Sequence, residues 1–79
     1  MNKQVTIRKI SEHNPSPNVS IGEERTGELL QLEIGRGIIV LHSNGTKAFH
    51  TSRVQHLDRI DHGWVAKTSN SIYKITINE

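Results

Sequence analysis

The dipeptide Asn44-Gly45 constrains the fold of this chain more than any other local feature. Asn-Gly suits the two central positions of a type I′ turn, where both residues need a positive φ angle, so it predicts a tight β-hairpin. Residues 38–41, just before it, are all apolar, which is typical of a strand covered on both faces. The hairpin register places two pairs opposite each other: Val40 with Phe49, and His42 with Lys47.

Short stretches with a two-residue periodicity recur along the rest of the chain, separated by turn-forming residues. Alternating β-branched and polar residues predict a strand over 5–10, and a final strand is expected over 71–77. A short strand over 64–68 lies between turns at 61–63 and 69–70. The last strand carries Tyr73, Ile75 and Ile77 on one face.

Three segments are less regular. Residues 26–34 are predicted to form a strand with Leu30, Leu32 and Ile34 on one face, while the run Glu-Leu-Leu-Gln-Leu-Glu leaves a very short helix as the alternative. Apolar residues recur every third position over 54–60 behind a Ser-x-x-Gln capping box, so one helical turn near 52–57 competes with a bend and a strand. Residues 11–20 contain two prolines, which predicts a loop.

About six short antiparallel strands joined by tight turns predict an all-β fold. Closure removes unpaired strand edges, so we expect a small barrel, first of the SH3-like type and second of the OB type. The 79 residues make one domain, residues 1–79. A chain of this length buries only roughly 60–65% of its unfolded surface. Because it has no cysteine, self-association is the remaining means of stabilisation, and we expect a homo-oligomer.

The sequence contains no motif for catalysis, metal binding or membrane insertion. No local motif presents a nucleophile to a histidine, so we expect no enzyme; a nuclease using His50 and His56 as acid and base is the remaining alternative. The histidines show neither HxH nor HExxH spacing, and we expect no metal and no cofactor. No apolar run reaches the roughly 18–20 residues that span a bilayer. Without a signal-peptide segment, a cytoplasmic protein with no membrane partner is expected.

Charge distribution points to an anionic ligand. The formal net charge is only +2, but acidic residues gather within 23–33, whereas basic residues dominate 36–74. Hydroxyl groups lie beside a cation at two predicted strand ends, an arrangement that suits phosphate contacts. The alternative is that these Ser, Thr and Asn side chains cap turns, and that Arg36 is an exposed turn residue. The predicted ligand-binding residues are Arg36, His50, Thr51, Ser52, Arg53, Lys67, Thr68 and Asn70.

Two segments resemble a group of short bacterial and phage-borne proteins. These are Phe-His-Thr-Ser-Arg-Val at 49–54 and Thr-Ser-Asn-Ser-Ile-Tyr-Lys-Ile at 68–75. The group shares a Thr-Ser-x-Val step followed by a Thr-x-Asn-Ser-x-Tyr strand. The resemblance implies a prokaryotic or viral source. It also implies action by binding: blocking a host defence enzyme, sequestering a signalling nucleotide, or regulating transcription.

Two functions follow as hypotheses. In the first, a non-enzymatic barrel captures a phosphate-bearing ligand, either nucleic acid or a nucleotide signal. In the second, the protein is an interaction module or an inhibitor of a host protein. The second would use the acidic strand over 23–33 or an exposed sheet edge, to which a partner could add a strand.

Overall fold

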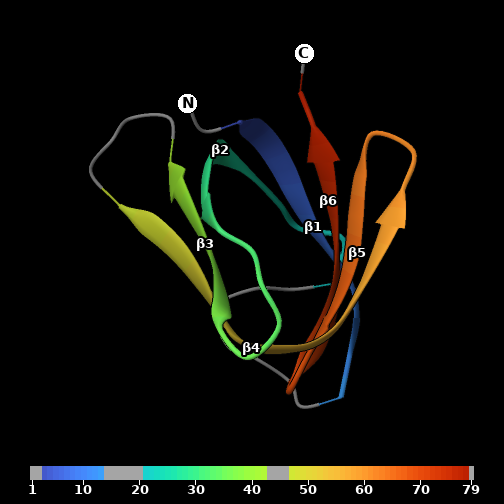
Figure 1. Ribbon diagram of the computed structural model, residues 1–79. Coiled ribbons are helices and arrows are strands. Elements are labelled where there is room, and N and C mark those ends of the chain that lie inside the picture. Colours follow the sequence, from blue (N-terminus) through green and yellow to red (C-terminus); the bar gives the residue numbers. More distant parts are fainter. Residues whose placement is uncertain (1–2, 14–20, 43–46, 79) are drawn as a thin grey trace.

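A closed antiparallel barrel of six strands forms the molecule (Figure 1). The computed structural model describes residues 3–13, 21–42 and 47–78, and these residues contain no helix. Each strand pairs with its neighbours in the chain, and β1 and β6 close the ring. The predicted all-β barrel is confirmed. The strands are β1 (Gln4–Glu12), β2 (Glu24–Gln31), β3 (Gly37–His42), β4 (Ala48–Ile60), β5 (Gly63–Thr68) and β6 (Ser71–Ile77).

Strand β4 is long because it serves both halves of the barrel. Its first part pairs with β3, and its second part, from Val54 onward, pairs with β5. Figure 1 shows β4 sweeping from the β3 side to the β5 side. The helical turn considered near 52–57 is wrong. A register shift between Val54 and His56 inserts an extra residue, so Val54 and Leu57 both face the core although they are three residues apart.

Strand β2 also contains an irregularity, so the residues that face the core differ from the predicted set. The strand is confirmed and the helical alternative is wrong. The register shifts between Leu29 and Gln31, and Leu29 packs against the core instead of Leu30. Leu30 is 44% exposed and Ile34, beyond the end of the strand, is 63% exposed. Of the three residues predicted to share one face, only Leu32 packs against the core.

The remaining hairpins agree closely with the turns and register predicted from the sequence. Val40 pairs with Phe49, and the amide of His42 donates to the carbonyl of Lys47 at 2.8 Å, as the predicted register requires. The turn at 61–62 contains His62 with a φ of 62°. The predicted loop begins later than expected, because residues 11 and 12 belong to β1. Residues 14–20 and the Asn-Gly turn itself lie outside the described residues.

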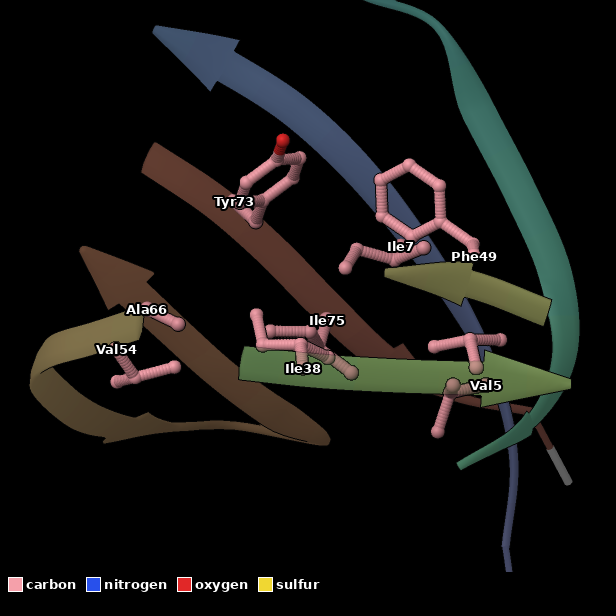
Figure 2. Packing of buried hydrophobic residues seen from close by; sticks show 9 residues of the cluster. Val5, Ile7, Ile38, Phe49, Val54, Ala66, Tyr73 and Ile75 are labelled. Atoms are coloured by element: carbon pink, nitrogen blue, oxygen red, sulfur yellow. The ribbon is translucent and has the colours of Figure 1, made fainter. Parts of the chain in front are cut away.

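Nine buried apolar residues fill the barrel, and Figure 2 shows both aromatic rings at one end of this cluster. The outer face of β3 is only partly covered, since Ile39 and Leu41 are half-buried. Strand β5 approaches β6 so closely that a Cβ atom at Gly63 would lie 1.8 Å from the carbonyl oxygen of Ile75. Only glycine fits there. The core residues are Val5, Ile7, Ile38, Val40, Phe49, Val54, Ala66, Tyr73 and Ile75.

Candidate functional site

A cavity of about 630 Å³ lies between the first part of β4 and the start of β6. Its position follows from the change of partner along β4. Residues 48–53 pair with β3, whereas pairing with β5 starts at Val54. Among the described residues, no strand therefore joins the other edge of β4 over 48–52. The volume falls within the roughly 300–1,000 Å³ of small-molecule sites.

The cavity brings together four of the eight predicted site residues: His50, Thr51, Ser52 and Asn70. They come from two segments that are separated by the whole of β5, so the fold is what joins them. None of the described residues that line the cavity is acidic. The other lining residues are Arg25, His42, Lys47, Ala48, Phe49, Ser71 and Tyr73.

Two of the predicted hydroxyl groups shape the wall of the cavity. The Thr51 Oγ1 hydroxyl accepts from the amide of Ile38 at 2.9 Å and donates to the carbonyl of Ser52 at 2.8 Å. The Ser52 Oγ atom accepts from the amide of Asn70 at 3.3 Å, which ties β4 to the turn before β6. These hydroxyls hold the two sides of the cavity in place. The other two predicted residues, His50 and Asn70, are exposed.

The other four predicted residues do not line the cavity. Arg36 lies in an exposed turn and pairs with Glu33 at 3.0 Å. Arg53 and Lys67 are exposed. Thr68 is fully buried; its Oγ1 donates to the carbonyl of Ser71 at 2.9 Å and accepts from the amide of Ser71 at 3.0 Å. Thr68 therefore caps the turn between β5 and β6. Turn capping was the predicted alternative to ligand binding for the Ser, Thr and Asn side chains.

Sequence reasoning missed three basic side chains that line the cavity. Lys47 and His42 are hairpin partners at the ends of β4 and β3. The Asn-Gly turn had already placed them opposite each other, so the sequence contained this signal. Arg25 of β2 is the ladder partner of the buried Ile7. Directly paired residues share a face of the sheet, so Arg25 faces inward, but only the register between β1 and β2 reveals it.

Two aromatic rings contribute to the same cavity. Phe49 and Tyr73 pack edge to face, with ring centroids 5.9 Å apart and an interplanar angle of 73°. Both belong to the core, at 9% and 6% exposure. In Figure 2 the Tyr73 hydroxyl points away from the aliphatic side chains. The cavity thus combines an apolar aromatic base with polar and cationic walls.

A buried ion pair lies behind this wall. The side chain of Lys9 is fully buried, and its Nζ atom lies 2.5 Å from the Glu12 carboxylate. Their ladder partners on β6 are Tyr73 and Ser71, and both of these line the cavity. Because paired residues share a face, the charged pair sits next to the cavity on the inner side of β1.

The described part of the chain holds no group of three or more His, Asp or Glu side chains that could bind a metal ion. Within the same residues, no helix is long and apolar enough to cross a membrane. Comparisons with protein-family models, with curated proteins and with solved structures find no match to this chain. Fold and cavity define its class: a small closed β-barrel with a cavity that basic and aromatic residues line.

Proposed function

We propose that this protein binds a nucleotide in the barrel cavity, as a capture protein that catalyses no reaction on it. One observation carries the proposal: two cations and two imidazoles line the same cavity as two aromatic rings, and no acidic residue is among the described residues that line it. Cationic donors suit a phosphate group. The aromatic floor and the unpaired edge of β4 suit a planar, hydrogen-bonding base.

The position of the aromatic rings favours a nucleotide over nucleic acid. Sequence-general binding of single strands depends on rings whose open faces stack on successive bases. Phe49 and Tyr73 are buried in the core instead, and the third large ring, Trp64, packs against the same core on β5. A partly open cavity of about 630 Å³ also suits one small ligand better than a continuous backbone.

The protein-interaction alternative has less support from the fold. Strand β2 carries much of the acidic segment, but it is paired on one side with β1 and on the other with β3. Strand addition needs a free edge, and the described ladders leave only short stretches of β2 without a partner, 24–26 on the β3 side and 30–31 on the β1 side. A protein partner would have to use these short stretches, exposed side chains of β2 such as Glu24, or the edge of β4 inside the cavity.

Thermal shift and isothermal calorimetry with a nucleotide panel test the proposal. Mononucleotides, linear dinucleotides and cyclic nucleotides form the panel, and an oligonucleotide and inorganic phosphate serve as comparisons. A ligand at one hundred times its Kd stabilises the folded state by about 2.7 kcal/mol. For a domain of this size, that is a rise in melting temperature of roughly 10–20 °C.

Variants locate the binding in the cavity. Arg25→Gln and Lys47→Gln should each weaken nucleotide binding about fivefold to thirtyfold, the loss of one charge-assisted contact at a partly exposed site. Lys74→Gln is the matched control, because it removes the same charge from an exposed position between the inward-facing residues of β6. Equal losses in all three variants, or no nucleotide response at millimolar concentrations, would contradict the proposal. Binding of the oligonucleotide alone, with a steep salt dependence, would replace it with nucleic-acid binding.

A further inference from the structure

The cavity cation Arg25 already has a carboxylate beside it. Its Nη2 atom forms an ion pair with Oε2 of Glu23. This carboxylate oxygen is buried and receives no hydrogen bond of good geometry from the described residues. The guanidinium of Arg25 therefore neutralises this carboxylate, and the two side chains remain partly exposed, at 29% for Arg25 and 34% for Glu23.

Glu23 also lies on the same side of the sheet as Arg25. The amide of Lys9 donates to the carbonyl of Glu23 at 3.3 Å, which continues the β1–β2 ladder by two residues from the pair of Ile7 and Arg25. Side chains two positions apart on a strand point to the same face. Glu24, between them, is exposed and belongs to the opposite face.

We infer that Glu23 is an internal counter-ion of the site, whose place at Arg25 is taken by a phosphate group of the ligand. Glu23 touches neither cofactor nor reacting atoms; it acts through Arg25, as a positioning residue that sets anion affinity. The inference rests on the proposed function only for the identity of the ligand. The location of the anion follows from the Arg25–Glu23 geometry and is independent of the proposed function.

Electrostatics gives this role a distinctive signature. A carboxylate beside the anion site repels a bound anion in proportion to the charge of that anion. A phosphomonoester carries a charge of about −1.5 to −2 at neutral pH, and a phosphodiester carries −1. Glu23→Gln should therefore tighten binding of both, and the logarithm of the gain should be about twice as large for the monoester.

Expected gains follow from the partial exposure of the pair. One unit of charge at such a site changes affinity about twofold to fivefold, so a cyclic diester should bind Glu23→Gln about twofold to fivefold more tightly. The corresponding monoester nucleotide should gain about fourfold to twentyfold. A purely structural role for the ion pair predicts the opposite sign, because a misplaced Arg25 would weaken both ligands.

Glu24→Gln is the matched control, since it makes the same change of charge at the next residue on the outer face of β2. Inorganic phosphate is titrated into wild type and both variants by thermal shift, alongside the two nucleotides. A phosphate response that is larger in Glu23→Gln than in Glu24→Gln supports the inference. Equal or weaker responses in Glu23→Gln overturn it, even where wild type binds nucleotides. If Glu23→Gln binds phosphate more tightly but neither wild type nor the variants bind nucleotides, the proposed function is wrong and the inference about Glu23 stands.

Discussion

Replacing Glu12 with glutamine should destabilise the barrel more than replacing its partner Lys9 with methionine. The two ends of this ion pair differ in exposure: the Lys9 side chain is 0% exposed and the Glu12 side chain is 25% exposed. Loss of the carboxylate leaves an enclosed cation with one partner fewer, whereas loss of the cation leaves a carboxylate that can reach water. Breaking a fully buried pair in this way costs about 3–5 kcal/mol.

The expected cost here is smaller, because Glu12 is partly solvated and Lys9 has further interactions. We expect Glu12→Gln to lower the free energy of unfolding by about 1.5–3 kcal/mol. Lys9→Met keeps most of the buried aliphatic volume and should cost less than about 1 kcal/mol. The double variant should resemble Lys9→Met, which corresponds to a coupling energy as large as the cost of Glu12→Gln, about 1.5–3 kcal/mol.

Urea unfolding, followed by circular dichroism and the fluorescence of the single tryptophan, measures these differences. A domain of 79 residues has a total stability of about 4–12 kcal/mol, so losses of this size are well resolved. Glu33→Gln is the control, because the Glu33–Arg36 pair has the same i,i+3 spacing but both side chains are more than half exposed. It should change stability by less than about 1 kcal/mol. Equal costs for Glu12→Gln and Glu33→Gln, or a larger cost for Lys9→Met, would refute the reasoning.

Three further substitutions test the fold. Gly63→Ala should lower stability by about 2–3 kcal/mol or prevent folding, because the new methyl group would meet the carbonyl oxygen of Ile75 at 1.8 Å; thermal melting measures this. Thr68→Val should cost about 1–3 kcal/mol in urea unfolding, since it removes both hydrogen bonds to the backbone of Ser71. Ile34→Ser should stay within about 0.5 kcal/mol of wild type in the same assay, because Ile34 is 63% exposed; a large loss would show that it packs against another surface.

Local signals in the sequence were sufficient for the hairpins and insufficient for the irregular strands. The pairing of Val40 with Phe49 follows from the position of one turn, Asn44-Gly45. Alternation breaks where a strand carries an extra residue, as between Val54 and His56, and the every-third spacing that results looks helical in the sequence. A bulge is needed there because β4 must bend from one half of the barrel to the other, a requirement that only the closed fold imposes.

The same distinction explains which site residues were predictable. His50 and Asn70 were predicted because hydroxyl groups lie beside a cation at these two strand ends, and both residues line the cavity. Lys67 was predicted on the same grounds, but it is exposed between the buried residues 66 and 68, so it faces away from the interior. Arg25 was missed because an inward-facing arginine looks like any surface charge until the register of β2 against β1 is known.

The place where β4 changes partner accounts for both the cavity and its chemistry. A closed six-strand barrel pairs almost all of its backbone, but residues 48–52 have a ladder on the β3 side alone among the described strands. Backbone donors and acceptors that lack a strand partner must be satisfied by water, by side chains or by a ligand. Across the gap, the Ser52 Oγ accepts from the amide of Asn70, so a side chain of β4 takes the place of a strand partner for the turn before β6. The rest of that edge lines a cavity that also holds Arg25 and Lys47. A ligand with a hydrogen-bonding planar edge at one end and a phosphate at the other would satisfy both needs at once, and a nucleotide has this shape.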